Sequence, residues 1–267
     1  MPVSKGHLNP GSPDVAFDRF ELGPGLAELV RHVWVVRWEI PAGQVRAQRV
    51  LTYPAFNAVF DAGSARLFGP SSRVQVQELA GTSWAVGVLF RPAAARILSG
   101  TEPALVPASG ERLQDAPVQA VAALMNESPR ASGARLALVG TLRSWLLPFI
   151  SLLDHRASLV NAVCELAEND DGILRSSDLA ERVNVPPRSL ERLVYSHLGV
   201  SPKWLIECRR LQHAATVLFA EPSTSLTGLA ASLGYTDYPH FSRSYKSVIG
   251  ETPRATRELG EAQRRDA

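Results

Sequence analysis

The stretch Leu226–Arg257 reads LTGLAASLGYTDYPHFSRSYKSVIGETPRATR, and parts of it repeat an earlier stretch of the chain. HFSRSYKSVIGETP (His240–Pro253) matches SLERLVYSHLGVSP (Ser189–Pro202) at an offset of 51 residues. Upstream, GLAASLGY (Gly228–Tyr235) matches DLAERVNV (Asp178–Val185) at an offset of 50. An offset that holds on both sides of a turn indicates a duplicated supersecondary unit.

Each copy has the pattern of a helix-turn-helix. Ala180 and Ala230 are small residues where the second helix would cross the first, and Asn184 and Gly234 tolerate the positive φ that the turn needs. In the second helix of each unit, apolar residues recur at every fourth position and predict a buried face. These residues are Leu190, Val194 and Leu198 in the first unit, and Phe241, Tyr245 and Ile249 in the second.

The opposite face of each second helix carries long polar and aromatic side chains, where a recognition helix meets base edges in the major groove. Arg192 and Arg243 occupy the same repeat position, and a guanidinium can bind either guanine O6 and N7 or a phosphate. The predicted DNA-contacting residues are Arg188, Ser189, Glu191, Arg192, Tyr195, Tyr238, Pro239, Ser242, Arg243 and Lys246.

Between the two units, PKWLIECRRLQHAATVLFA (Pro202–Ala220) predicts one continuous helix. At ~1.5 Å per residue it would be roughly 27 Å long, near the ~34 Å between successive major-groove faces of B-DNA. Such a helix could hold two recognition helices on neighbouring turns of one DNA face. Trp204, Leu205, Leu211 and Leu218 are expected to tie the units to it.

The residues from about Leu159 to Arg257 resemble the DNA-binding domain of AraC/XylS-family transcription regulators. Leu226–Arg257 fills nearly every place of the family's second-unit signature, including Ala-x-x-x-Gly-Tyr, Phe-x-Arg-x-Tyr-Lys and Gly-x-Thr-Pro. The resemblance implies that the two second helices read successive major-groove segments. It also makes double-stranded DNA, a small-molecule effector, a second copy of the chain and RNA polymerase candidate partners. Pro186, Pro187 and Pro239 depart from the usual pattern and remove backbone donors to phosphate.

Charge and composition are compatible with this interpretation. The net charge is only +2, but Leu174–Arg257 holds 11 Lys and Arg against seven Asp and Glu, and a mildly basic module can bind DNA if its cations share one face. The most apolar window, Leu136–Leu153, contains Arg143 and Pro148, and the first residues have no apolar signal-like run. We therefore expect no membrane span and a cytoplasmic protein. Cys164 and Cys208 are not part of a CxxC motif, which argues against a disulfide framework or a zinc finger.

The chain divides near residues 151–158. The predicted architecture is a β-rich α+β domain with helices, followed by an all-α domain in which a long helix joins two helix-turn-helix units. The predicted domains are an effector-binding or dimerisation domain at 1–155, the AraC-type DNA-binding domain at 156–260 and a tail at 261–267.

Predicted strands are Val33–Ile40, Phe56–Asp61, Ser64–Phe68, Arg73–Leu79 and Trp84–Phe90. Predicted helices are Leu26–His32, Pro92–Gly100, a stretch from Pro117 to about Leu153 broken by NESPRASG at 126–133, and then Leu159–Glu168, Ser177–Asn184, Arg188–His197, Pro202–Ala220, Leu226–Leu233, Pro239–Val248 and Pro253–Leu259.

The first domain is less informative. Gly69–Gly100 resembles an uncharacterised N-terminal domain of a subgroup of these regulators. Arg91 could hold an anionic ligand or form a structural ion pair, and the Ala134–Phe149 helix could be core, a dimer seam or a contact with the DNA-binding domain. Its aromatic residues could line an effector pocket or form the sheet core; they are Trp34, Trp38, Tyr53, Phe56, Phe68, Trp84 and Phe90.

No catalytic motif occurs in the sequence, and His7, His32 and His155 lie far apart in it, so we predict no catalytic residue, metal site or cofactor. The sequence predicts a sequence-specific DNA-binding transcription regulator controlled through its first domain, and not an enzyme. Two alternatives stay open. One is an enzyme domain tethered to a DNA-binding module, and the other is an architectural DNA binder without effector control.

Overall fold

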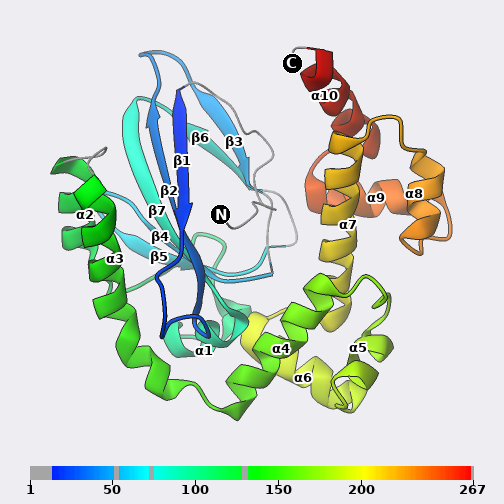
Figure 1. The fold of residues 1–267 in the computed structure, drawn as a ribbon, viewed down its shortest axis with the longest axis horizontal. Coiled ribbons are helices and arrows are strands. Elements are labelled where there is room, and N and C mark those ends of the chain that lie inside the picture. Colours follow the sequence, from blue (N-terminus) through cyan, green and yellow to red (C-terminus); the bar gives the residue numbers. More distant parts are fainter. Residues whose placement is uncertain (1–13, 51–53, 72–74, 128–131, 266–267) are drawn as a thin grey trace.

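Figure 1 shows the computed structural model of the chain, which describes residues 14–50, 54–71, 75–127 and 132–265. A β-rich domain with helices is followed by an all-helical domain, as the sequence predicts. His7, Tyr53, the start of the predicted strand at Arg73 and the centre of the NESPRASG break lie outside the described residues.

The first domain is built on a six-stranded antiparallel sheet with the strand order β1-β2-β7-β4-β5-β8. Strands β3 and β6 pair separately as a second, two-stranded antiparallel sheet. β-branched and aromatic residues suit such pleated surfaces. The bounds are β1 Val15–Phe20, β2 Val30–Glu39, β3 Arg46–Val50, β4 Asn57–Phe60, β5 Ala65–Phe68, β6 Gln75–Leu79, β7 Thr82–Phe90 and β8 Glu111–Arg112.

One face of the large sheet carries the core of this domain, and helices α2 (Val118–Glu127) and α3 (Ser132–Leu146) cover it. Two aromatic contacts join the sheet to these helices. Trp84 Nε1 donates to Asn126 Oδ1 at 2.8 Å, and the rings of Phe60 and Trp145 meet edge-to-face at 5.5 Å. Such contacts add to the apolar burial that drives the packing.

One predicted element is wrong. Leu26–His32 is not a helix, because a single turn at Leu26 is followed directly by strand β2. The amides of Leu29 and Val30 donate to Leu26 O, and Val30 then pairs with Phe90 of β7. Tertiary pairing thus overrides a short local helical pattern. Strands β1, β3 and β8 were not predicted, whereas the five predicted strands overlap β2, β4, β5, β6 and β7.

The helical pieces of the first domain follow the prediction more closely. The predicted helix at Pro92–Gly100 occurs as a 3-10 turn, η1 (Pro92–Ala94), followed by α1 (Ala95–Leu98). A further 3-10 turn, η2, covers Pro103–Leu105, and a longer one, η3, covers Leu147–Leu152 at the end of α3.

The apolar stretch Gly133–Leu152 is long and apolar enough to cross a membrane by length and composition alone. In the structure, Leu138, Leu142 and Leu146 on one side of it are buried in the core of the first domain. Arg143 donates to the carbonyls of Leu22 and Pro24 at 2.6 and 2.9 Å. One side of this helix therefore packs as a core helix, as the sequence allowed.

Every predicted helix of the second domain is present, and the bounds of the joining helix α7 agree with the prediction. Figure 1 shows α7 as a column, with α5 and α6 near its lower end and α8 and α9 near its upper end. The bounds are α4 His155–Asn169, α5 Ser176–Arg182, α6 Pro187–Leu198, α7 Pro202–Ala220, α8 Leu226–Ser232, α9 Tyr238–Ile249 and α10 Pro253–Arg265.

The buried apolar residues form two cores. The first core runs from the sheet through α4, α5 and α6 and ends at Ile206 in α7. The second core begins at Cys208 and holds α8, α9 and the rest of α7. The first helix-turn-helix therefore shares its core with the β-rich domain, and the second has a core of its own.

Candidate nucleic-acid interface

The turns of the two helix-turn-helix units begin with the same hydrogen bond, and the second turn is one residue longer. Val185 N donates to Ala180 O at 3.0 Å in the first unit, and Tyr235 N donates to Ala230 O at 3.0 Å in the second. The residues before them, Asn184 and Gly234, have φ angles of 50° and 75°. This left-handed conformation is the reason why Asn and Gly occupy the turn.

The second helix of each unit has the predicted buried face. Leu190, Val194 and Leu198 of α6 are buried, as are Phe241, Tyr245 and Ile249 of α9. Each helix ends at a glycine with positive φ, Gly199 at 69° and Gly250 at 86°. This is the usual left-handed C-cap.

The predicted DNA-contacting residues lie on the opposite faces. In α6, Arg188, Glu191, Arg192 and Tyr195 are exposed, and Ser189 is half-buried. In α9, Pro239, Arg243 and Lys246 are exposed, whereas Tyr238 and Ser242 are half-buried. Tyr238 packs against the Phe241 ring at 6.2 Å, so only part of its ring is accessible.

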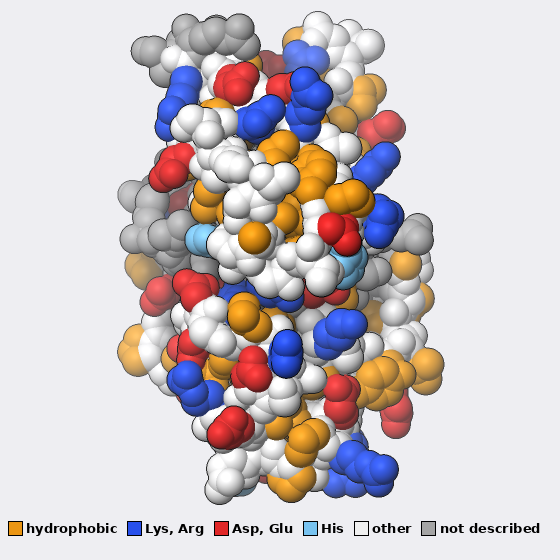
Figure 2. All heavy atoms as spheres, turned by 90° about the vertical axis from the view of Figure 1, so that its right-hand side faces the viewer, with side chains coloured by type: hydrophobic (Ala, Val, Ile, Leu, Met, Phe, Trp, Pro, Cys, Tyr) orange, Lys and Arg blue, Asp and Glu red, His pale blue; other side chains and the backbone are white. Residues whose placement is uncertain are grey.

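The cations of these faces are not neutralised within the part of the chain that the structure describes. Arg188, Arg192, Arg243 and Lys246 form no ion pair with a residue described there. Figure 2 shows the side of the molecule formed by the helical domain, where Lys and Arg alternate with Asp, Glu and an apolar cluster. On this side of the molecule, the positive charge is therefore carried by separate Lys and Arg side chains and not by one continuous basic patch.

The two helices begin differently. At α9, Asp237 Oδ1 accepts from the His240 amide at 2.7 Å and caps the helix. At α6, Pro186 is the N-cap residue and offers no side-chain cap. Pro187 begins α6, one residue before the predicted start at Arg188, and Pro239 stands in the first turn of α9 as predicted; neither supplies an N–H. Side chains therefore carry most of the contacts that these helix starts can offer to DNA.

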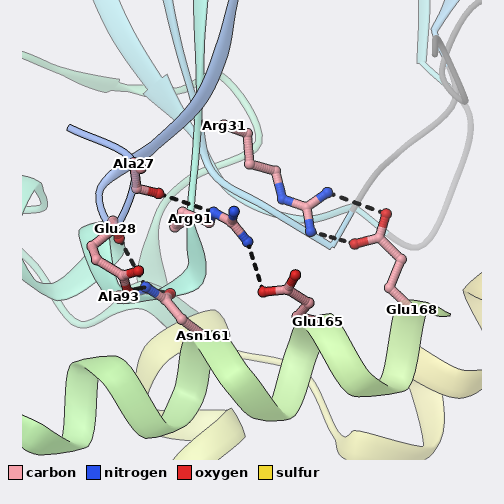
Figure 3. A network of polar contacts seen from close by, with 8 residues as sticks. All are labelled: Ala27, Glu28, Arg31, Arg91, Ala93, Asn161, Glu165 and Glu168. Atoms are coloured by element: carbon pink, nitrogen blue, oxygen red, sulfur yellow. Dashed lines mark hydrogen bonds and ion pairs between the residues drawn. The ribbon is translucent and has the colours of Figure 1, made fainter. Parts of the chain in front are cut away.

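A polar network joins α4 to the β-rich domain, and Figure 3 shows it. Arg31 of β2 forms a two-point ion pair with Glu168. Arg91 binds Glu165 at 3.2 Å and donates to Ala27 O at 3.2 Å. Arg91 thus takes the structural role of the two that the sequence left open. The sequence carried no signal for the network, because its partners are far apart along the chain.

Asn161 adds a buried contact at the same place. Its Oδ1 accepts from the Ala93 amide at 3.0 Å, and its Nδ2 donates to Glu28 O at 2.8 Å. A buried amide that satisfies two backbone groups holds both elements in one arrangement. The 3-10 turn η1 and the turn before β2 are therefore fixed to α4.

The recognition helix α6 also touches the first domain. A Cβ added to Gly199 would lie 2.6 Å from the Ala104 Cα in η2. His197 and Leu193, which precede Gly199 in the same helix, are buried too. His197 Nδ1 lies 2.9 Å from Leu193 O, and burial lowers the pKa of His197. The C-terminal half of α6 is therefore part of the interface between the two domains.

The candidate effector residues divide between the two faces of the sheet. Phe56, Trp84 and Phe90 are buried in the core, the second of the roles considered for them. Trp34 and Trp38 are half-buried, as is Phe68. The Trp34 ring lies flat over Gly87, where an added Cβ would come within 1.9 Å of it, and its Nε1 donates to Asn57 Oδ1 at 3.2 Å.

The titratable side chains of the described residues include no group of three or more that could hold a metal ion. Cys164 and Cys208 are both buried and free, and burial raises the pKa of Cys164 to about 12 and that of Cys208 further. Both thiols are therefore protonated near neutral pH and act as small core residues.

Comparison with known protein families finds one match in each of the two domains. Residues 179–259 match a family described as a helix-turn-helix domain, and residues 19–106 match a domain of unknown function, DUF6597. The C-terminal domain is an AraC-type helix-turn-helix domain. The residues matched to the AraC-type domain include both turns and both recognition helices.

The similar curated proteins are transcriptional regulators. ArgR of Pseudomonas aeruginosa is 32% identical over 99 residues, which is 37% of this chain and 30% of the relative. GbdR of the same species is 35% identical over 105 residues, 39% of this chain and 28% of the relative. The matched part of this chain thus spans less than a third of the length of these relatives.

Two similar solved structures differ in how much of the chain they cover. A transcriptional regulator with an AraC-type DNA-binding domain from Chromobacterium violaceum is 34% identical, covers 38% of this chain and 90% of its own, and has a TM-score of 0.34. ToxT from Vibrio cholerae is 13% identical, covers 92% of this chain and 97% of its own, and has a TM-score of 0.42.

Proposed function

We propose that this chain is a sequence-specific DNA-binding transcription regulator in which α6 and α9 enter two successive major-groove segments. The observation that carries the proposal is the equivalence of the two units. Each presents an exposed arginine at the same repeat position, Arg192 in α6 and Arg243 in α9. Neither arginine has an ion-pair partner among the described residues, so both are available to guanine or phosphate.

The proposal includes control through the first domain, by a small molecule or a partner. The support is physical continuity, because the first helix-turn-helix shares a core with the β-rich domain, and α4, which precedes it, shares a polar network with that domain. A ligand that binds one arrangement of that domain more tightly than another would shift the equilibrium towards the arrangement it prefers. The shift in free energy equals the difference in the ligand's binding free energy for the two states, and the position of α6 would change with it. We propose that the protein acts in the cytoplasm.

The proposal extends to a homodimer and to contact with RNA polymerase. Leu136, Leu147 and Leu152 are exposed along α3 and η3, and an apolar surface of this kind supports pairing with a second copy. Light scattering on the full chain tests this, with a mass of twice 28.9 kDa expected. The polymerase contact rests on the family resemblance alone.

Substitution of the two arginines tests the DNA proposal. Arg243→Ala in the full chain should weaken binding to a selected duplex by about 1–3 kcal/mol and weaken binding to random duplex much less. Arg192→Ala should do the same in the other segment. Arg112→Ala, an exposed arginine of β8 in the first domain, is the matched control and should leave both affinities unchanged. An equal loss on both duplexes would show that Arg243 contacts phosphate only.

A further inference from the structure

Two consecutive arginines of α7, Arg209 and Arg210, lie where the two helix-turn-helix units meet. The Arg209 side chain is 8% exposed and points to the turn between α4 and α5. Its Nη1 donates to Asp170 O, and its Nη2 donates to Ile173 O at 2.6 Å. One guanidinium thus binds two backbone carbonyls just before the first helix of unit one.

Burial makes this contact hard to exchange for another. A buried guanidinium is tolerated only when its donors are satisfied, and the Asp171 carboxylate also lies 3.9 Å from the Arg209 Nη1. The turn is also tied to α5, because Arg182 Nη1 binds Asp170 Oδ2 at 2.7 Å. Arg209 therefore fixes the direction of α5 relative to α7.

Arg210 makes the corresponding contact with unit two. Its guanidinium carbon lies 4.5 Å from the centre of the Tyr235 ring, a cation–π geometry. Tyr235 closes the turn after α8, and its ring meets Phe241 of α9 edge-to-face at 5.3 Å. Arg210 therefore covers the residue that connects the turn of unit two to its recognition helix.

The two contacts bring the units against each other. A Cβ added to Gly234, in the turn of unit two, would lie 3.5 Å from Arg210 Nη2 and 3.9 Å from Leu174 Cδ1. Leu174 follows the turn that Arg209 holds. Adjacent residues of a helix point about 100° apart. One turn of α7 can therefore hold both units at once.

We propose that Arg209 and Arg210 are positioning residues that set the spacing and angle between the recognition helices α6 and α9. The proposal rests on the proposed function, because it assumes that both helices bind DNA. The core packing of each unit does not depend on these side chains, since Leu190 and Val194 belong to the first core, which the first unit shares with the β-rich domain, and Phe241 and Tyr245 belong to the second. Loss of the pair should therefore release the geometry between the units and leave each unit able to bind its own segment.

The test uses the full chain and a duplex obtained by selection from a random double-stranded library with the wild-type protein. Affinity is measured on this duplex and on versions with one or two base pairs inserted between the two protected segments. Wild type should lose about tenfold or more on the inserted duplexes, the scale of a mismatched base pair. Arg210→Ala and Arg209→Met should lose less than about threefold between the same duplexes. Arg210→Lys retains the cation and should restore most of the discrimination.

Three outcomes would contradict the positioning role, and the first of them would also contradict the proposed function. If wild type enriches no two-segment site, the proposed function fails first. If the variants bind two segments with the wild-type spacing penalty, only the positioning role fails. If the variants lose affinity equally on every duplex and melt earlier than the Arg112→Ala control, the arginines are structural only. If Arg209→Met does not fold, the Arg210 pair of variants decides, because Arg210 lies on the surface of the Tyr235 ring and holds no buried carbonyl.

Discussion

Arg31 of β2 and Glu168 of α4 form a two-point ion pair across 137 positions of the chain, at the boundary between the sheet and the DNA-binding domain. Both side chains are largely buried, at 18% and 15% exposure. The pair, with Asn161 and the Arg91–Glu165 contact, fixes α4 to the β-rich domain, and the first helix-turn-helix shares the same core. This physical link is the basis of the proposed control.

Neutralising one partner of this pair should destabilise the first core. Glu168→Gln leaves the Arg31 guanidinium largely buried without its counter-charge, and we expect a loss of about 1–3 kcal/mol in the free energy of unfolding. A double-mutant cycle with Arg31→Met measures the coupling directly. Glu258→Gln, which removes the exposed Arg254–Glu258 pair, is the control and should change stability by less than about 0.5 kcal/mol. Equal effects at both pairs would contradict a special role for Arg31 and Glu168.

Asn161→Ala should be costly for a different reason. It leaves the Ala93 amide and the Glu28 carbonyl without their partner in a buried place, a cost of about 1–3 kcal/mol. Asn169→Ala, at the exposed end of the same helix, should have little effect. Chemical denaturation of the two variants side by side makes the comparison. Similar midpoints would mean that water readily replaces Asn161.

Acid should weaken the same region through His32. Burial, with the nearby charges of Arg19 and Arg31, lowers the pKa of His32 from its usual 6.5 to about 4. As pH falls, the His32 imidazole therefore becomes protonated in the unfolded chain before it does in the folded chain. The stability that comes from burying the neutral imidazole is fully present above pH 6.5 and is lost as pH falls towards 4. Allowing for its partial exposure, we expect about 1–2 kcal/mol. The melting temperature of His32→Gln should fall less between pH 7 and pH 4.5 than that of wild type, and parallel curves would refute this.

Two Gly→Ala substitutions should have opposite signs. At Gly87 an added Cβ would enter the Trp34 ring, which overpacks the sheet and should cost about 1–3 kcal/mol or more. At Gly140, within α3, the space around the added Cβ is open, and alanine should stabilise the helix by about 0.5–1 kcal/mol. Thermal unfolding checks both variants. A stable Gly87→Ala protein would show that Trp34 is not held against the sheet.

The local features of the DNA-binding domain were predictable from the sequence because they depend on neighbours in the chain. The i, i+4 repeat at Leu190 and Val194, and the turn residues Asn184 and Gly234, specify helices, faces and turns without distant contacts. The same patterns placed Arg192 and Arg243 on the exposed side, where the structure has them.

The interdomain contacts were not predictable in this way. Arg31 and Glu168, or Arg209 and Ile173, meet only because the whole fold brings them together. The predicted helix at Leu26–His32 was wrong for the same reason, because Val30 pairs with β7 and so begins a strand. The sharing of one core between the sheet and the first helix-turn-helix is likewise a tertiary property.

We propose that α6 and α9 bind two adjacent major-groove segments together, and hydroxyl-radical footprinting of the full chain on a selected duplex observes both segments in one experiment. We expect two protected segments on one face of the DNA, with centres about one helical turn (~10 base pairs) apart, and loss of only the corresponding segment in Arg192→Ala or Arg243→Ala. If the wild-type chain protects a single segment, and this footprint is unchanged in Arg192→Ala or in Arg243→Ala, the result would contradict binding by both helices.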